Sequence, residues 1–324
     1  MAMTASRTTP TLHSILDPLG VHAQHIDVIW QTMLWVCGVM FLIVFTFGVL
    51  AVMRGRAKHQ GQDVTPQHRK FSIALVVWTT LVVLGLFGLT MTSFFTDRAL
   101  VRAAAEPDVL IKVTGYQWWW DVEYLHSDPS QRFKTANEIH VPVDAQVLLQ
   151  LNSHDVIHSF WIPNLNGKRD LIPGRPTEFT LQPRQKGIYR GECAEFCGLQ
   201  HAHMAFDFVV ESKEDFERWR QRQLASAPTP PDAKTQLGLS VFMDSACSMC
   251  HAISGTPAFA QLGPDLTHVA SRRMIASGTL ANTPENMRRW ILNPHDPKPG
   301  TLMPAVSLPD EQLDALVAYL GTLK

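Results

Sequence analysis

A short stretch of the chain, G-E-C-A-E-F-C-G-L-Q-H-A-H-M, concentrates side chains that could bind a metal. It holds two thiols, an imidazole and a thioether, at Cys193, Cys197, His201 and Met204. Sulfur and imidazole form a soft ligand set, and soft sets favour copper over magnesium, calcium or manganese. Two cysteines at this spacing can both bridge a pair of metal ions, which leaves one histidine for each ion. The best placed second histidine is His158, upstream in V-I-H-S-F-W-I-P.

Two other chemistries fit part of this pattern. Cys193 and Cys197 could form a disulfide, because disulfides persist in exported domains. A structural zinc site of two cysteines and two histidines is the second alternative, but it leaves Met204 without a role. The neighbouring histidines His203 and His154 are expected to lie on the surface or behind the ligands.

A second cluster is C-S-M-C-H, at Cys247, Cys250 and His251, which is the C-x-x-C-H signature of c-type heme attachment. The two thiols of such a site form thioethers with the heme, and the histidine binds the iron. The same pattern also arises by chance or in zinc and redox motifs. Residues 235–324 follow a Pro/Ala-rich linker and have the size of a small cytochrome c.

The sixth iron ligand must come from downstream of the signature. Met303 is favoured, because P-G-T-L-M-P forms a constrained loop just ahead of the last expected helix. Ser307 and Asp310 are expected to cap that helix. Met274 and Met287 also lie downstream and are expected to be packing residues. His268 is the alternative sixth ligand in place of a methionine.

Two long apolar runs near the N-terminus, residues 28–53 and 71–95, predict a transmembrane helical hairpin. Residues 54–70 are rich in lysine and arginine, and short basic loops stay in the cytoplasm. Both termini are therefore expected in the periplasm, with residues 1–27 as an N-terminal periplasmic segment without signal-peptide features. Cys37 lies inside the first run and is expected to be an inert packing residue.

Residues 107–212 change to short runs of alternating apolar and polar side chains with Gly and Pro between them, which predicts a β-sandwich or barrel. Trp118, Trp119 and Trp120 cannot all face inward, because strand side chains alternate. Residues 213–234 follow as a charged amphipathic helix and a linker. The chain is nearly neutral, with a net charge of −1, so nothing suggests nucleic-acid binding.

The pattern C-x-E-x-C-x-x-x-H-x-x-M with an upstream H-S-F-W-I-P resembles the binuclear copper (CuA) site of cytochrome c oxidase subunit II. The resemblance implies a Greek-key cupredoxin barrel in which Cys193 and Cys197 bridge two copper ions. His158 and His201 would bind one copper each, and Met204 would be a weak ligand. Glu195 would give its backbone carbonyl to copper and its side chain to a magnesium ion shared with subunit I.

Other stretches resemble the same family. G-Y-Q-W-W-W-D is similar to the family's G-H-Q-W-Y-W, which implies that electrons reach copper through Trp118, with Trp120 as runner-up. K-R-D-L-I-P-G-R is similar to the family loop that lies against subunit I, which makes docking candidates of Lys168, Asp170 and Arg175. The C-terminal third resembles an all-α class I cytochrome c, which implies one covalent heme bound by Cys247, Cys250, His251 and Met303.

The resemblance therefore implies the electron-input subunit of a cytochrome c oxidase in a bacterial inner membrane. Electrons would pass from cytochrome c or another periplasmic donor through heme c and CuA to heme in subunit I. Oxygen reduction to water and proton pumping would belong to the complex, which includes subunit I and subunit III. The chief alternative is a membrane-tethered heme and copper electron carrier without an oxidase partner.

Overall fold

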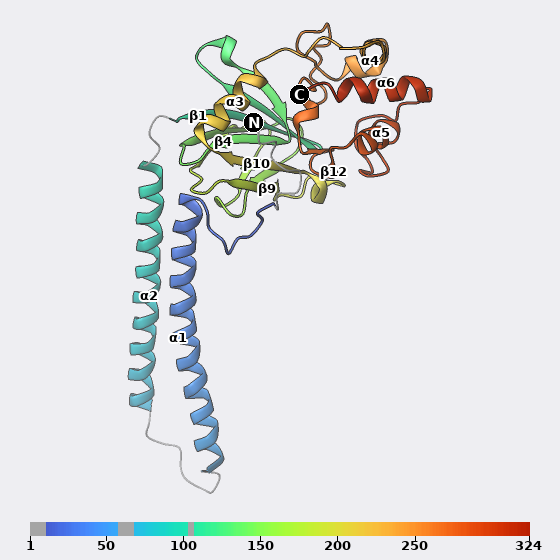
Figure 1. The fold of residues 1–324 in the computed structure, drawn as a ribbon. Coiled ribbons are helices and arrows are strands. Elements are labelled where there is room, and N and C mark those ends of the chain that lie inside the picture. The colour runs from blue at the N-terminus through green and yellow to red at the C-terminus, as the bar shows by residue number, and fades with distance from the viewer. Residues whose placement is uncertain (1–10, 58–67, 103–106) are drawn as a thin grey trace. The chain divides into compact units, whose positions relative to one another are not determined.

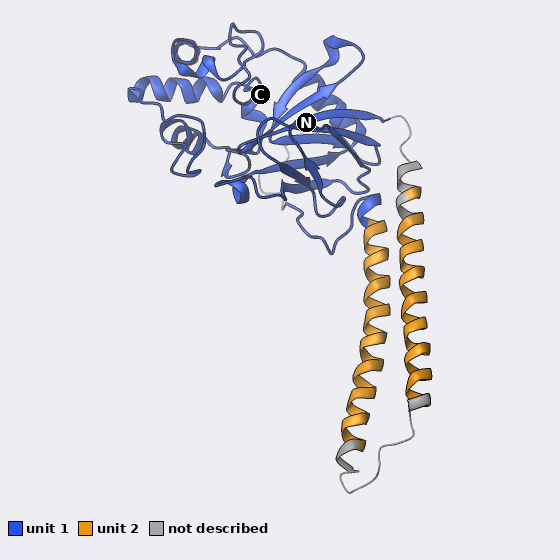
Figure 2. Ribbon diagram, turned by 180° about the vertical axis from the view of Figure 1, so that it is seen from behind, with its two compact units in different colours: residues 1–23, 105–324 blue, residues 24–104 orange. Residues whose placement is uncertain are grey.

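The computed structural model describes residues 11–57, 68–102 and 107–324 of the chain. The chain forms two compact units, one made of Met1–Ala23 with Ala105–Lys324 and the other of Gln24–Ala104 (Figure 2). The first unit contains a β-domain followed by a helical C-terminal domain.

Two long helices form the second unit, α1 (Val21–Ala57) and α2 (His68–Arg102) (Figure 1). Both are long and apolar enough to cross a membrane, over Val21–Arg54 and Lys70–Phe95. Threonine hydroxyls in both helices donate to the carbonyl four residues earlier, as Thr32 does to Val28 at 2.7 Å and Thr80 to Val76 at 2.8 Å. Such a bond satisfies the hydroxyl donor within its own helix, as the interior of a bilayer requires. Most of the basic loop predicted at residues 54–70 lies outside the described residues.

The segment before α1, for which no secondary structure was predicted from the sequence, packs onto the β-domain. Leu12 forms a parallel bridge with Tyr189, and its backbone N–H donates to Ile188 O at 2.7 Å. The buried side chain of Asn164 accepts from Ser14 N and donates to Asp17 O, both at 2.9 Å. Residues 11–20 therefore belong to the core structure of the first unit.

The β-domain is a cupredoxin-like sandwich of two five-stranded sheets, ordered β3-β2-β1-β5-β8 and β4-β10-β9-β6-β7. Alternating apolar residues of both sheets fill the space between them, and Trp120 at its centre is fully buried. Its indole packs edge-on against the rings of Phe160 and Phe206, with ring centroids 5.7 and 5.4 Å apart. The strands are β1 (Val109–Tyr116), β2 (Trp119–Leu125), β3 (Phe133–Ala136), β4 (Glu138–Pro142), β5 (Val147–Ser153), β6 (His158–Trp161), β7 (Arg169–Leu171), β8 (Thr177–Leu181), β9 (Gly187–Cys193) and β10 (Ala205–Glu211).

Helix α3 (Lys213–Gln223) closes the β-domain and begins after Ser212, whose hydroxyl accepts from Asp215 N at 3.1 Å. The C-terminal domain follows, with helices α4 (Ala233–Asp244), α5 (Pro284–Leu292) and α6 (Asp310–Leu320) and the short pair β11 (Met274–Ile275) and β12 (Leu280–Ala281). Helices α4 and α6 cross closely at Gly238, where a Cβ would stand 2.1 Å from Ala315 O. The cap expected from Ser307 does not form, because the residue preceding α6 is Pro309 and no side chain caps the helix.

Candidate metal and heme sites

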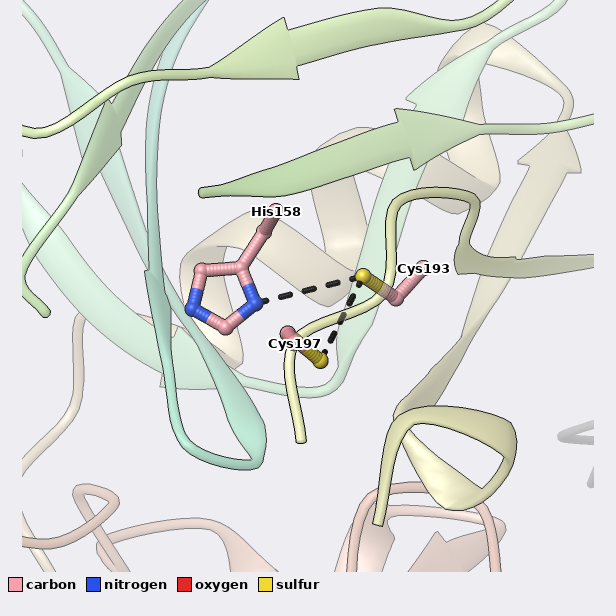
Figure 3. Close-up of side chains that lie close together, drawn as sticks. All are labelled: His158, Cys193 and Cys197. Atoms are coloured by element: carbon pink, nitrogen blue, oxygen red, sulfur yellow. Dashed lines mark hydrogen bonds between the residues drawn. The ribbon is translucent and has the colours of Figure 1, made fainter. Parts of the chain in front are cut away.

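Strand ends hold the candidate metal ligands in place. His158 is the first residue of β6, and Cys193 is the last residue of the neighbouring strand β9. The loop from Cys193 to Met204 is closed by a hydrogen bond between these two residues, Cys193 N to Met204 O at 2.9 Å. Figure 3 shows His158 and both cysteines pointing toward one another. Sheet pairing therefore brings together residues that lie 35 positions apart.

The two cysteines are not joined. Their Sγ atoms are 3.8 Å apart, far beyond the ~2.05 Å of a disulfide bond, and both thiols are free and buried. The disulfide alternative is therefore absent from the structure.

An imidazole flanks each sulfur. His158 Nδ1 lies 3.9 Å from Cys193 Sγ, and His201 Nδ1 lies 3.7 Å from Cys197 Sγ. Met204 Sδ is 3.8 Å from Cys197 Sγ, while Glu195 O is 3.2 Å from Cys193 Sγ. Two central sulfurs with a nitrogen on each side fit two soft cations, and the thioether and the carbonyl add one weaker donor near each sulfur.

A shared proton shows how strongly the two thiols interact. The hydrogen bond from Cys197 lowers the pKa of Cys193 to about 3, with further support from His158. The same bond, together with burial, raises the pKa of Cys197. Two thiolates so close repel each other, and cations bound between them would replace the proton and stabilise both charges.

The His158 ring is fixed from two sides. Asp155 Oδ1 bonds its Nε2 at 2.8 Å, which leaves Nδ1 directed at Cys193. Burial opposes protonation of His158, but the bonds to Asp155 and Cys193 raise its pKa overall. On the other side, a Cβ at Gly115 would stand 2.8 Å from the ring's Cδ2. Asp155 and Gly115 orient a ligand in the way carboxylates and close packing orient metal-bound histidines.

Trp118 directly contacts the loop from Cys193 to Met204, which carries most of the candidate metal ligands. Its indole Nε1 donates to Cys197 O at 2.9 Å, and Gln117 Nε2 donates to the same carbonyl at 2.7 Å. Trp120 lies deeper, with its ring 6.2 Å from the ring of His158. Trp119 is the least buried of the three and stacks on Tyr116. The other local histidines have different partners, since His203 bonds Gln200 and His154 stacks on Tyr116.

The polar loop that follows β6 contains the three docking candidates. Lys168 forms an ion pair with Glu195 at 3.2 Å, and both side chains are largely exposed. Asp170 lies in β7 opposite Ser159 of β6, and Arg175 is exposed in the turn that follows. Lys168 thus contacts the loop from Cys193 to Met204 through Glu195.

The C-x-x-C-H signature forms a tight turn. His251 N donates to Cys247 O at 2.9 Å, and Cys250 N donates to the same oxygen at 3.1 Å. His251 Nδ1 is 2.7 Å from Pro264 O, so Nδ1 carries the proton and Nε2 is the atom that can bind iron. A Cβ at Gly263 would stand 2.6 Å from the ring. Burial lowers the pKa of His251, which favours the neutral form that a metal needs.

The candidate sixth ligands occupy different environments. Met287 is buried in α5, Met274 lies in β11, and Met303 lies half-buried in the irregular segment before α6. Both ring nitrogens of His268 are bonded to backbone oxygens, to Lys324 O at 2.9 Å and Ala225 O at 3.1 Å. In this structure the His268 ring thus contacts backbone oxygens on both sides, whereas Met303 lies in the irregular segment before α6.

A buried arginine is the feature of the heme site that sequence reasoning missed. Arg272 is 6% exposed, and its Nε has no partner among the described residues. Burial lowers the pKa of Arg272, whose charge in turn helps to lower the pKa of His251. Arg272 Nη2 donates to Asp265 O at 2.5 Å, and a heme, which brings carboxylates, would fit the remaining Nε donor of this buried cation. The signal in the sequence is only an arginine 21 residues after His251, which no short motif marks.

Two long apolar helices, a cupredoxin-like domain with a sulfur–imidazole site and a C-x-x-C-H domain define a membrane-anchored electron-transfer protein. Residues 109–213 match the family described as cytochrome C oxidase subunit II, periplasmic domain, and residues 235–324 match cytochrome c. The match to the first family implies copper in the β-domain, and the match to the second implies heme in the C-terminal domain.

Relatives extend the similarity over nearly the whole chain. Cytochrome c oxidase subunit 2 of Alkalihalophilus pseudofirmus is 34% identical over 95% of this chain and 90% of that protein. Cytochrome c oxidase subunit 2 of Bacillus sp. strain PS3 is 32% identical over 77% of this chain and 74% of that protein. The crystal structure of the periplasmic domain of subunit II of cytochrome oxidase from Bradyrhizobium japonicum is 30% identical, covering 37% of this chain and 95% of that one, with a TM-score of 0.34.

The chain therefore belongs to the family of cytochrome c oxidase subunit II and carries a C-terminal cytochrome c domain. It is a subunit of a heme-copper oxidase complex, and the predicted family and fold class are confirmed.

Proposed function

We propose that this chain is the electron-input subunit of its oxidase and relays single electrons from a periplasmic donor to subunit I. Cys247, Cys250 and His251 hold a covalent heme with Met303 as sixth ligand. Electrons then reach a pair of copper ions by way of Trp118 and leave toward heme in subunit I. Bound heme and copper supply the one-electron chemistry, while the complex reduces oxygen to water and pumps protons.

One observation supports this function above the others, the arrangement of two free thiols between two imidazole nitrogens. The sulfur–sulfur separation of 3.8 Å and the nitrogen–sulfur separations of 3.9 and 3.7 Å suit two bridged cations. A single zinc ion would not take the thioether of Met204 as a ligand, although this thioether lies 3.8 Å from Cys197 Sγ. Buried ligands on strand ends also move little when copper changes charge, and small movement favours fast electron transfer.

The proposal includes a place in the cell and a set of partners. The chain lies in a bacterial inner membrane through α1 and α2, with both termini and the copper and heme domains in the periplasm. Its partners are subunit I, subunit III and cytochrome c or a similar donor. Lys168, Asp170 and Arg175 lie against subunit I, where the Glu195 side chain helps to bind a shared magnesium ion. Lys168, which pairs with Glu195 in the structure, would move aside for that ion.

Purification of the intact complex under mild conditions tests the proposal. The wild-type chain should co-purify with a heme-containing polytopic subunit and show a c-type heme spectrum together with a mixed-valence copper EPR signal. Cys197→Ser should lose the copper signal and keep the heme spectrum, because one of the two bridging sulfurs is gone. Cys37→Ser, which alters a cysteine in α1, is the matched control and should keep both.

Two outcomes would contradict the proposal. An EPR-silent site that contains zinc would overturn the copper assignment. A chain that never co-purifies with another heme-containing subunit would instead be a tethered electron carrier.

A further inference from the structure

Lys298 is buried, although it lies in an irregular segment of the C-terminal domain. It is 2% exposed, and its partners within the described part of the chain are carbonyl oxygens rather than carboxylates. A lysine ammonium is rarely buried without a counter-charge, because desolvation opposes it. Burial accordingly lowers the pKa of Lys298 to about 7. A residue held against this cost needs a structural reason.

The ammonium group joins the two domains of the first unit. Lys298 Nζ donates to Trp118 O at 2.7 Å and to His203 O at 2.9 Å, both in the β-domain. Its third acceptor is Ala276 O of the C-terminal domain, at 3.2 Å. The first acceptor belongs to Trp118, which contacts the loop from Cys193 to Met204, called the copper loop from here on. The second acceptor belongs to the copper loop itself.

The residues after Lys298 continue this contact. Pro299 O accepts from the buried Gln200 side chain at 2.7 Å. Gly300 has a φ of +81°, and a Cβ there would stand 2.8 Å from the Leu199 side chain and 3.9 Å from the Trp118 ring. Met303, the favoured heme ligand, follows three residues later. The segment 298–303 thus connects the indole of Trp118 to the expected position of the iron.

A second loop of the C-terminal domain contacts the β-domain beside the first. Ser277 Oγ donates to Ala205 O at 2.9 Å, and Ala205 N donates back to Ser277 O at 3.1 Å. Arg190 Nη1 donates to Gly278 O at 3.0 Å. Ala276, Ser277 and Gly278 all have positive φ, and within this turn the polar groups of Ser277 and Gly278 bond the β-domain.

We propose that Lys298 is the positioning residue that holds the segment 298–303 on Trp118 and keeps the heme domain docked at the copper loop during turnover. The inference rests on the proposed electron relay and specifies its geometry. One electron leaves the ferrous heme, which becomes ferric, and enters the copper pair without movement of a proton. Docking gives that electron a fixed connection, from the segment 298–303 to Trp118 and through its Nε1 bond to Cys197 O.

Docking also decides where an outside donor can act. Trp118 is only 9% exposed in this arrangement, so a soluble cytochrome cannot reach its indole. An external donor must therefore reduce the C-terminal domain first. The alternative arrangement, a heme domain that swings on the segment after α3 and docks transiently, would leave Trp118 open for part of each cycle.

The test is the rate of electron transfer from heme to copper inside the intact complex after flash reduction of the heme. Lys298→Met keeps the apolar stem and removes the ammonium. Transfer should slow by ~10-fold or more, because the variant loses two hydrogen bonds to the β-domain and a single charge-assisted bond is already worth about that factor in the docking equilibrium. It should also become slower as solvent viscosity is raised, because a loosened segment must move before the electron does. The heme spectrum and the copper content should stay unchanged, because no expected heme or copper ligand is replaced.

Lys134→Met is the matched control. Lys134 also crosses between the domains, from its Nζ to Gln261 Oε1 at 3.0 Å, but its other partner is Asp121 Oδ2 at 3.6 Å rather than Trp118 O. This variant should transfer electrons at the wild-type rate with no dependence on viscosity. If Lys298→Met fails to fold, Ser277→Ala loosens the second loop more mildly and should introduce the same viscosity dependence.

Two failures can be told apart. If wild-type heme never reduces copper, the proposed relay is wrong. If wild-type transfer is fast and both Lys298→Met and Ser277→Ala match its rate and its independence of viscosity, only the positioning role is wrong.

Discussion

His140 in β4 is a buried imidazole held between two carboxylates. Its Nε2 is 3.0 Å from Glu138 Oε1, and its Nδ1 is 2.9 Å from Glu211 Oε1. The ring stacks on Trp219 at 4.2 Å. Since a neutral imidazole has only one N–H donor, bonds to two carboxylates require the doubly protonated cation. The β-domain is therefore expected to lose stability when His140 is deprotonated.

The size of this loss of stability follows from the pKa of His140. Burial opposes the charge, but Glu138 and Glu211 outweigh burial and raise the pKa of His140 from 6.5 to about 9. The native state therefore holds a proton that the unfolded chain has released, and stability falls as the pH rises from 6.5 to 9. At 1.36 kcal/mol for each pH unit, the loss is roughly 3 kcal/mol for this side chain, which is 12% exposed.

Urea unfolding followed by tryptophan fluorescence at pH 6.5 and pH 9 measures this loss. The double variant His140→Asn with Glu211→Gln removes the cation and one of its carboxylates, so it should be less stable at pH 6.5 and lose much less than wild type on going to pH 9. His126→Asn, the same change at an exposed histidine, should behave as wild type. Equal losses in wild type and the double variant would refute the assignment.

Three further predictions concern other parts of the structure. Met303→Leu should abolish the iron–sulfur charge-transfer absorption of the ferric heme, whereas Met274→Leu should keep it; the reverse result would move the sixth ligand to Met274. Gly115→Ala places a Cβ 2.8 Å from the His158 ring and should shift the copper EPR signal while the heme spectrum stays unchanged, and an unshifted signal would contradict that packing. Trp219→Ala removes a side chain that is 5% exposed and should lower the free energy of unfolding by about 3–5 kcal/mol in the same urea assay, so a loss below 1 kcal/mol would argue against its burial.

Short-range patterns allowed much of the fold and the copper loop to be predicted. Cys193, Cys197, His201 and Met204 lie within one loop, so their spacing alone predicts that they meet. The alternation of apolar residues predicted strands such as β1 and β5 because each strand buries one face. His158 was predicted as the best placed upstream imidazole, and the resemblance to the family gave it the role of a copper ligand.

Residues that act across long distances were missed. Asp155, Arg272 and Lys298 are charged residues, and charged residues in irregular segments are usually solvated. Arg272 and Lys298 are instead buried, and the burial of Lys298 depends on carbonyl oxygens of the β-domain, which local sequence does not show. The N-terminal segment was missed for the same reason, because Leu12 pairs with β9 more than 170 residues later.

The copper loop is restrained by both domains of the first unit, and this has a consequence for its ligands. At its base, Cys193 N bonds Met204 O within the β-domain. Along its outer part, Gln200 donates to Pro299 O and His203 O accepts from Lys298, so the C-terminal domain holds the residues on both sides of His201. A dinuclear site needs its ligands at fixed separations, and a loop held only at its ends would not provide them. A weakened domain interface should therefore disturb His201 before it disturbs His158 and Cys193, which are fixed by the sheet itself.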